Sequence, residues 1–225
     1  MCGRFSLTVD QEALTMRFAP CTLVTPYQPR FNIAPGQTVT AVIASHGTRR
    51  IGQLFWGLAI SGLTSGKSAG RIINARAETL AVKATFRDSL LYRRCLIPAD
   101  GFFEWPKTEN NRLPLRFTRQ DSGVMALAGI YEPFLDTSGT PKYACAIITT
   151  PPNELIGAYH NRMPAILSQD QENIWLQQTE QDPDRLLALL RPYPANLMRG
   201  YRVSALVNNV KNDCPECIEP IPSRP

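Results

Sequence analysis

The sequence predicts an α+β fold, built as a mainly antiparallel, barrel-like β-sheet with a few helices at its periphery. Three features of the sequence support this prediction. Short apolar runs rich in Val, Ile, Phe and Tyr recur through the middle of the chain, 19 prolines and 14 glycines punctuate them, and helical patterns lie toward the two ends. The regular alternation of strand and helix that marks a doubly wound parallel sheet is not found.

Seven strands are expected from apolar runs of four to eight residues, which the prolines and glycines of the chain punctuate. They span residues 38–44, 51–56, 94–97, 101–105, 115–119, 124–131 and 143–149. The expected helices cover residues 10–18, 77–85 and 168–177, and a further one begins at Pro183. Ser168 is placed to cap its helix and Pro183 to open one, as residues of these types commonly do.

The length and composition of the chain fit one compact domain with a sizeable core. It has 225 residues, 44% of them hydrophobic and 19% charged. We therefore expect a single domain over residues 1–225, with an extended tail from about residue 212. Residues 62–70 (GLTSGKSAG) are expected to form a mobile surface loop inside that domain.

Charge is distributed unevenly along the chain. Residues 1–125 carry 16 basic and 8 acidic residues, a net +8, whereas residues 126–225 carry 8 and 11, a net −3. Nineteen of the 24 cations are Arg, whose planar guanidinium suits bidentate contact with phosphate. A polyanionic partner and a merely solvated basic surface both fit this bias.

Nothing in the sequence predicts export or a membrane span. The longest apolar run, residues 124–130, is far shorter than the roughly 18 residues that cross a bilayer, and the first ten residues lack an apolar signal core. We therefore expect a cytoplasmic protein without a membrane partner.

The six cysteines are expected to be thiols, because a disulfide scaffold belongs to exported chains. Cys95 and Cys145 lie in apolar runs and are predicted to be buried in the core. Cys214 and Cys217 have metal-like spacing, but a structural zinc needs four ligands and the chain has only two histidines. A reversible disulfide or a plain loop is favoured there, and we expect no metal and no cofactor.

Cys2 follows the initiator methionine, and a small residue at this position permits removal of Met1. Cys2 would then carry both a free α-amine, with a pKa of about 7.7 to 8.0, and a thiol of pKa about 8.5. An aldehyde is the natural target of this pair, because the amine forms an imine and the thiol closes a thiazolidine ring intramolecularly. A frayed terminus without chemistry is the alternative that the dipeptide alone leaves open.

Three further segments combine polar residues with strand or turn surroundings. If the segment of residues 73–79 is extended, Asn74 and Arg76 project to the same side and offer an amide and a guanidinium to one site. Glu104 lies among aromatic residues, where desolvation would raise its pKa toward the range of a general acid or base. His160, with Arg162 two positions on, could transfer a proton. An outward-facing strand Glu and a structural His remain the alternatives.

Seven motifs occur in an order that matches a known family. They are MCGRF at residue 1, FNIAPG at 31, FWGL at 55, INARAET at 73, RCLIPADGFFEW at 94, HNRMP at 160 and VNNVK at 207. The chain resembles the SRAP family, the SOS-response-associated peptidases, over nearly its whole length. That resemblance implies a DNA damage protein that binds single-stranded DNA and crosslinks itself to abasic sites.

The resemblance also implies roles for individual residues. It makes Cys2 the nucleophile, with Asn74 orienting the amine, Glu104 as acid and base, and His160 assisting ring opening and crosslink reversal. The residues that it implies in DNA binding are Arg4, Asn32, Pro35, Arg76, Trp105 and Arg162. A monomer without a cofactor is expected.

One departure from the family pattern concerns the residues after Trp56. The family continues through a Pro to a second Trp that helps to wedge the DNA, whereas this chain reads AISGL over residues 59–63. A preference for junctions of single- and double-stranded DNA is therefore in doubt. Two other functions stay open: a cysteine peptidase that uses Cys2 with His160 and Glu104, and a single-strand-binding module without catalysis.

Overall fold

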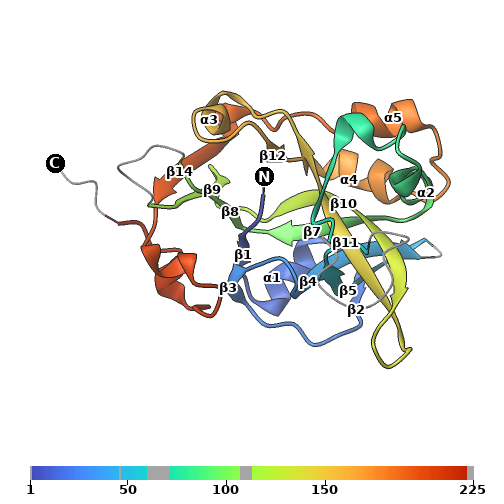
Figure 1. Ribbon diagram of the computed structural model, residues 1–225, viewed down its shortest axis with the longest axis horizontal. Helices are drawn as coiled ribbons and strands as arrows, with labels where there is room; N and C mark the ends of the chain where they lie inside the picture. The colour runs from blue at the N-terminus through green and yellow to red at the C-terminus, as the bar shows by residue number, and fades with distance from the viewer. Residues whose placement is uncertain (1, 46, 60–70, 107–112, 222–225) are drawn as a thin grey trace.

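Five strands close into a barrel in the order β4, β5, β11, β10, β7 (Figure 1). Their bounds are Thr38–Ser45 for β4, Thr48–Trp56 for β5, Arg94–Ala99 for β7, Met125–Leu135 for β10 and Pro141–Thr150 for β11. The computed structural model describes residues 2–45, 47–59, 71–106 and 113–221. All barrel pairs are antiparallel except β11 with β5, so the predicted barrel-like α+β fold is confirmed.

A second, antiparallel sheet packs beside the barrel and carries the N-terminal strand. Its order is β14-β9-β8-β1-β3, with bounds Met198–Arg202, Leu115–Arg119, Gly101–Glu104, Phe5–Leu7 and Arg30–Ile33. Shorter strands extend the barrel sheet, namely β2 (Cys21–Leu23), β6 (Asn74–Arg76), β12 (Met163–Pro164) and β13 (Ile166–Leu167). β6 and β12 both pair with the end of β11, and this matters for the site.

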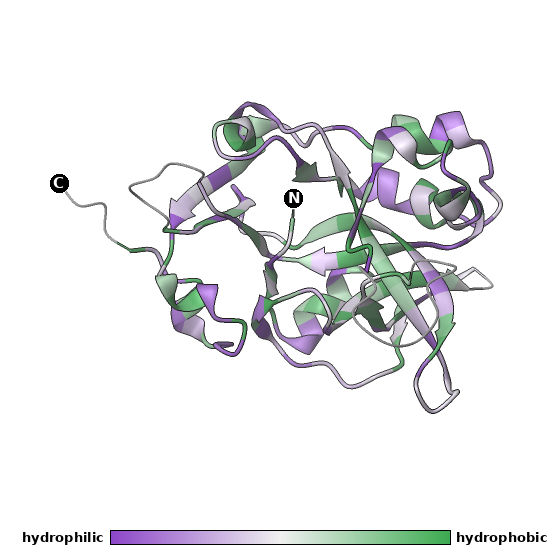
Figure 2. Ribbon diagram, viewed as in Figure 1, coloured by the Kyte–Doolittle hydropathy of each residue, from purple (hydrophilic) through white to green (hydrophobic). Residues whose placement is uncertain are grey.

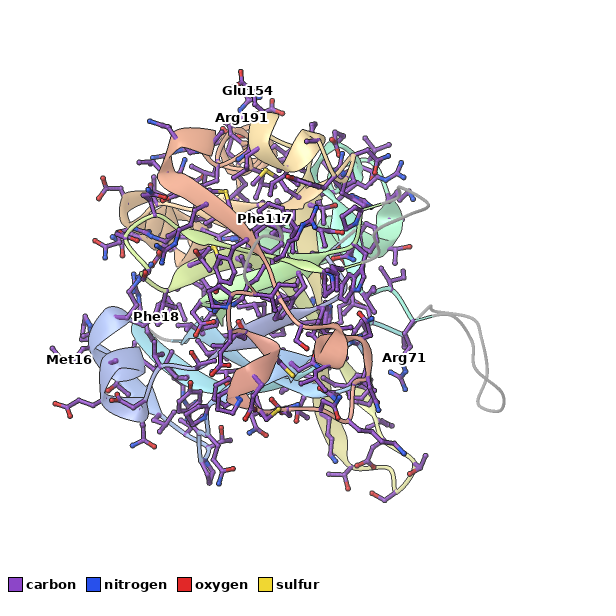
Figure 3. All side chains as sticks on the ribbon, turned by 90° about the vertical axis from the view of Figure 1, so that its left-hand side faces the viewer. Met16, Phe18, Arg71, Phe117, Glu154 and Arg191 are labelled. Carbon is purple, nitrogen blue, oxygen red and sulfur yellow. The ribbon has the colours of Figure 1, made fainter. Side chains whose placement is uncertain are left out.

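The core fills the barrel and the space between the two sheets. Figure 2 shows hydrophobic residues concentrated on the barrel strands and mixed polarity on the surrounding helices. Phe117 lies in the interior, whereas Met16 lies at the edge of the molecule (Figure 3). Trp56 is fully buried, and its indole N–H donates to the backbone carbonyl of Ile73 at 2.8 Å. It is therefore a core residue and cannot stack on a base from this position.

Local sequence signals explain three of the helices. Asp10 caps α1 (Gln11–Arg17) by accepting from the Ala13 N–H at 2.8 Å. Ser168 and Gln171 form a capping box at the start of α4 (Gln169–Leu176). Pro183 is the first residue of α5 (Pro183–Ala188), as predicted. A further one-turn helix, α3 (Glu154–Gly157), was not expected.

The helix expected over residues 77–85 is wrong. A 3-10 turn, η1 (Ala77–Thr79), follows β6 directly, and the helix α2 begins later and spans Ala84–Tyr92. The later position buries Phe86, Ser89 and Leu90, which share one helical face. Burial of that face, rather than the helix propensity of the Ala- and Glu-containing segment before it, decides where the helix forms.

The C-terminal segment folds back onto the second sheet instead of extending from residue 212. The 3-10 turns η2 (Ala195–Leu197), η3 (Ala205–Asn208) and η4 (Pro215–Cys217) shape this part of the chain. Cys217 joins Phe103, Val203 and Val207 in a small second hydrophobic cluster. The loop expected over residues 62–70 lies outside the described residues.

The cysteine predictions agree with the structure where it tests them. All six cysteines are free, and Cys95 and Cys145 are fully buried as expected. Within the described ranges, no helix has the length and hydropathy that would let it span a bilayer.

Candidate functional site

Cys2 lies at the inner end of the N-terminal segment, which enters the molecule beside β8. β1 pairs antiparallel with both β3 and β8, and the Phe103 N–H continues the pairing by donating to the Arg4 carbonyl at 2.9 Å. Figure 1 shows the N-terminal end near the centre of the view, between the strands of the second sheet and the barrel. Cys2 is fully buried, so the segment is held in place and is not a frayed terminus.

The end of strand β11 brings two distant motifs together. Its residues Ile147 to Thr149 pair in parallel with β6, and Thr149 and Thr150 pair antiparallel with β12. β6 carries Asn74 and Arg76, while His160 and Arg162 lie in the turn just before β12. The INARAET and HNRMP motifs thus flank the same end of β11, one on each side of the strand.

Asn74 contacts the backbone of Cys2 directly. Its Nδ2 donates to the Cys2 carbonyl at 2.9 Å across 72 positions of sequence. Its Oδ1 is buried and accepts no hydrogen bond from any described residue. Because buried amide oxygens are normally satisfied, this atom is available to a further hydrogen-bond donor.

Glu104 is the acidic group beside Cys2. It ends β8, is only 4% exposed, and burial raises its pKa to about 7. Burial, followed by the charge of Glu104, raises the pKa of the Cys2 thiol to about 12. At neutral pH the thiol is therefore protonated, and Glu104 is poised to exchange a proton, as a general acid or base requires.

The turn that carries His160 is fixed by Arg162. His160 Nδ1 lies 3.0 Å from the backbone N of Arg162 and 3.2 Å from the Arg162 carbonyl oxygen, so either tautomer of the ring can bond to the Arg162 backbone. The Arg162 guanidinium in turn makes two bonds to Glu78, of 2.6 and 2.9 Å, and a third to the Thr149 carbonyl at 2.5 Å. Glu78 was not predicted as a site residue, although it lies inside the INARAET motif.

Arg4 and Trp105 form a second group near Cys2. The Arg4 guanidinium lies over the Trp105 ring at 5.5 Å from its centroid, within cation–π range. Arg4 Nη1 also donates to the Val207 carbonyl at 2.5 Å and to Asn32 Oδ1 at 2.7 Å. Trp105 is half-buried, and its indole N–H donates to Asn208 Oδ1 at 2.7 Å.

Asn32 is fully buried, and its amide faces the interior. Its Nδ2 donates to the carbonyls of Val207, Asn209 and Asn212 at 3.2, 3.1 and 2.6 Å. From this position Asn32 positions Arg4 and the loop of residues 207–213 instead of presenting its own amide at the surface. The partners in this loop were not predicted, because no motif near Asn32 points to residues about 180 positions away.

Pro35 is half-buried, and Arg76 is the exposed member of the predicted set. Pro35 and Gly36 occupy the central positions of a tight turn closed by a bond from the Gln37 N–H to the Ala34 carbonyl at 3.3 Å. Gly36 has φ +84°, which is the left-handed conformation that a type II turn needs at this position. Arg76 is exposed at the end of β6, so its guanidinium can meet an anion at the surface.

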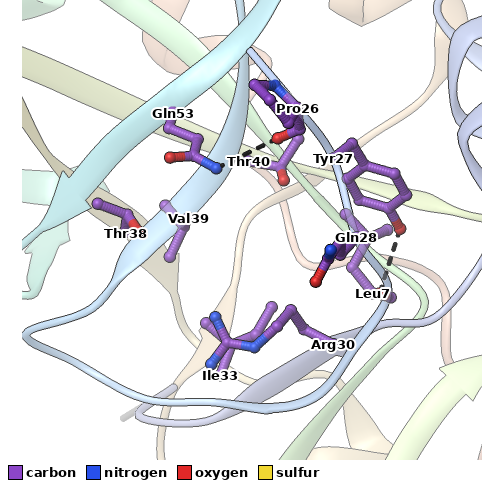
Figure 4. A pocket seen from close by; sticks show the side chains of 10 residues that line it. All are labelled: Leu7, Pro26, Tyr27, Gln28, Arg30, Ile33, Thr38, Val39, Thr40 and Gln53. Carbon is purple, nitrogen blue, oxygen red and sulfur yellow. Dashed lines mark hydrogen bonds between the residues drawn. The ribbon is translucent and has the colours of Figure 1, made fainter.

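A separate pocket lies at the far end of β1, away from Cys2 (Figure 4). Leu7, Tyr27, Arg30 and Gln53 are among its lining residues, and Tyr27 there donates to the Leu7 carbonyl at 3.3 Å. It contains none of the residues predicted for the site. The candidate site is therefore the group around Cys2 and not this pocket.

Comparison with known proteins agrees with the motifs. The family model "SOS response associated peptidase (SRAP)" matches residues 1–210. The chain belongs to the SRAP family. Within it, the Bacillus subtilis protein named abasic site processing protein YoqW is 42% identical over 222 residues, which cover 97% of this chain and 99% of that protein.

More distant SRAP relatives and solved structures extend the comparison. Abasic site processing protein YedK of Escherichia coli is 29% identical, with 98% of this chain and 100% of that one covered. Abasic site processing protein HMCES of Gallus gallus is 29% identical, with 87% and 67% covered. A crystal structure of a Bacteroides thetaiotaomicron protein superposes with a TM-score of 0.83 at 24% identity, over 98% of this chain and 100% of that one, and so shares the fold.

Proposed function

We propose that this protein binds single-stranded DNA at an abasic site and joins itself covalently to the lesion through Cys2. The observation that carries the proposal is the bond from Asn74 to the Cys2 carbonyl, with the Glu104 carboxyl close by. These three residues come from β6, from β8 and from the start of the chain, and they meet at one buried point. The names of the SRAP relatives support abasic DNA as the substrate.

The reaction starts once Met1 has been removed. The α-amine of Cys2 condenses with the aldehyde of the ring-opened deoxyribose, forming a C=N bond and releasing one water. The Cys2 sulfur then adds to the carbon of that bond, the thiol proton passes to the nitrogen, and a five-membered thiazolidine closes. Because both nucleophiles belong to one residue, the second step is intramolecular, and effective molarities for such steps reach about 10⁵ M or more.

Two side chains supply the protons that these steps need. A Cys2 thiol of pKa about 12 is a poor nucleophile, so it must lose its proton as the carbon–sulfur bond forms. Glu104, with a pKa of about 7, accepts that proton and returns it to the nitrogen. His160, held by the Arg162 backbone, assists opening of the sugar ring and reversal of the crosslink.

The DNA strand lies across the surface next to Cys2. Arg76 and Arg162 hold phosphates on the β6 and β12 side of the lesion, and Arg4 holds one on the other side. Pro35 and the half-buried face of Trp105 line the path, where an aromatic ring can stack on a base. Asn32 contributes by fixing Arg4 and the loop of residues 207–213.

The decisive experiment mixes the purified chain with a single-stranded oligonucleotide that contains one abasic site. The intact mass of the protein is measured first, because the α-amine belongs to Cys2 only when Met1 is absent. Met-free protein is expected to give a heat-stable, slower-migrating species without any reducing agent. If Met-free protein gives no such species, the proposal is overturned.

Two variants separate the proposed chemistry from its alternatives. Cys2→Ser and Cys2→Ala keep the α-amine, so each forms an imine that borohydride traps but no stable product without reduction. A stable product from Cys2→Ala would show that the thiol is not used. Peptide hydrolysis that a thiol reagent blocks, without any DNA product, would identify a cysteine peptidase instead. DNA binding that is unchanged in every variant, again without a covalent product, would identify a non-catalytic binding module.

A further inference from the structure

Cys214 and Cys217 form a thiol pair that the proposed reaction does not use. Their Sγ atoms lie 3.9 Å apart, which is the only thiol–thiol contact of hydrogen-bond geometry in the described chain. Cys214 is half-buried and immediately precedes η4, whereas Cys217 ends η4 and is fully buried. One thiol is therefore reachable from solvent and its neighbour lies directly behind it.

The backbone between the two residues already has the geometry of a short disulfide loop. The Cys217 N–H donates to the Cys214 carbonyl at 3.0 Å, which closes a four-residue turn. Residues that flank such a turn have Cα atoms less than about 7 Å apart, and disulfides span Cα separations of about 4.4 to 6.8 Å. Rotation of the Cys214 side chain can therefore close the remaining gap while the backbone stays in place.

The turn is attached to β3, the strand that carries Asn32 of the candidate site. Asp213, immediately before Cys214, accepts from the backbone N–H groups of Phe31 and Asn32 at 2.6 and 3.1 Å. The Cys217 thiol donates to the Asn212 carbonyl at 3.6 Å, and the same carbonyl accepts from the Asn32 amide. The bond from the Cys217 thiol is lost when the disulfide forms, so a constraint on the turn is passed through the backbone of Cys214 to Asp213, which holds the loop of residues 207–213 against Phe31 and Asn32.

We propose that Cys214 and Cys217 are a redox modification site, whose reversible disulfide restricts the local opening of the loop of residues 207–213. The oxidant is a small-molecule disulfide. The Cys214 thiolate attacks one of its sulfurs, forms a mixed disulfide and releases one thiolate. Cys217 then loses its proton, and its sulfur displaces the second thiolate as the Cys214–Cys217 bond forms. Two protein thiols are oxidised and one small disulfide is reduced to two thiols.

The expected effect is a lower population of the locally opened loop. An opening that releases Asp213 and also unfolds the turn of residues 214–217 is reduced by up to about 20-fold when the disulfide closes that four-residue ring, in the chain-entropy treatment of disulfides. Lys211 is exposed and lies inside the loop, so trypsin cleavage after this residue reports the opening. Lys83 is exposed between η1 and α2, far along the chain from the pair, and provides the reference cleavage site.

The test treats the full chain with oxidised glutathione at about pH 8.5, where the thiolate fraction is larger than at neutral pH. A hydrogen bond with Glu216 is the main factor that raises the pKa of the Cys214 thiol to about 11, so exchange is expected to accelerate as pH rises. The expected product has lost two hydrogens, and the new bond maps to the peptide that contains both cysteines. Cleavage after Lys211 should slow relative to Lys83, and dithiothreitol should restore it.

Matched variants distinguish the Cys214–Cys217 disulfide from reactions of the other thiols. Cys21→Ser removes the other half-buried thiol and should leave both effects intact. Cys214→Ser should abolish both, with cleavage after Lys211 at the rate of the reduced protein. A glutathione adduct that does not resolve, a bond to another cysteine, or a Cys214–Cys217 bond that leaves cleavage unchanged would each overturn the proposal. None of these readouts depends on DNA crosslinking.

Discussion

Replacing Glu104 by Gln should raise the free energy of unfolding of the protein and slow its crosslinking reaction. Glu104 is 4% exposed, and its pKa of about 7 lies well above the ordinary value of 4.5. Below pH 4.5 the carboxyl is protonated in both the folded and the unfolded chain, so its burial carries no ionisation penalty. As pH rises through 7, the folded state must either hold a desolvated carboxylate or retain a proton that the unfolded chain has released. Stability is therefore lost with rising pH.

The magnitude follows from the two pKa values. The rise of the Glu104 pKa from 4.5 to about 7 corresponds to about 3 kcal/mol of lost stability once the pH is above both values. Most of this stability is lost between about pH 5 and pH 8. Glu104→Gln removes the ionisable group while keeping the shape. The variant should therefore be more stable than the wild type by about 3 kcal/mol at pH 8, and the gain should nearly vanish toward pH 4.

The assay is urea unfolding of both proteins at several pH values, with the free energy of unfolding compared at each. Glu78→Gln is a control whose free energy of unfolding should change in the opposite direction and fall below that of the wild type at neutral pH. The reason is that hydrogen bonds from Arg162 hold the pKa of Glu78 below its ordinary value. In parallel, the crosslinking rate of Glu104→Gln should fall by about 10² to 10⁴, the usual contribution of a general acid or base. A stability difference that does not grow with pH would refute the assigned pKa, and an unchanged crosslinking rate would refute the catalytic role.

Three further variants test other parts of the site and its support. Asn74→Ala removes the bond to the Cys2 carbonyl and should slow crosslinking about 10-fold, at unchanged DNA affinity measured by fluorescence anisotropy. Arg76→Gln should reduce the slope of log affinity against log salt concentration by about 0.7, the loss of one single-strand phosphate contact. Asp100→Asn leaves the buried Arg116 without its partner at 2.7 Å, and urea unfolding should show a loss of about 3 to 5 kcal/mol.

The barrel was predictable because its strands are long and carry uninterrupted apolar runs. β9 has the predicted bounds, and β4, β5, β7, β8, β10 and β11 differ from them by a few residues. The short strands β1, β3, β6 and β12 were not predicted, because two to four residues carry no periodicity. They form because partner strands supply their hydrogen bonds, and that pairing is a property of the tertiary fold.

The identity of the candidate site residues was more predictable than their partners. Cys2, Asn74 and Glu104 stood out because each offers a reactive or hydrogen-bonding group in unusual surroundings, and the structure places them together. The partnership of Glu78 with Arg162 was not visible, since it requires β6 and β12 to lie on opposite sides of β11. A motif shows which residues to consider, and only the strand order shows which of them meet.

The excess of arginine is weaker evidence for DNA binding than the composition suggested, because the fold uses many guanidinium groups internally. Arg94 is buried and donates to the carbonyls of five residues, namely Leu90, Leu91, Trp175, Gln177 and Glu180. Arg116 pairs with Asp100 in the core. A planar guanidinium with five donors serves these positions better than Lys, so the preference for Arg has a structural cause. Stronger support for a DNA lesion as substrate comes from the few atoms around Cys2, where Asn74 and Glu104 meet a residue able to bear two nucleophiles.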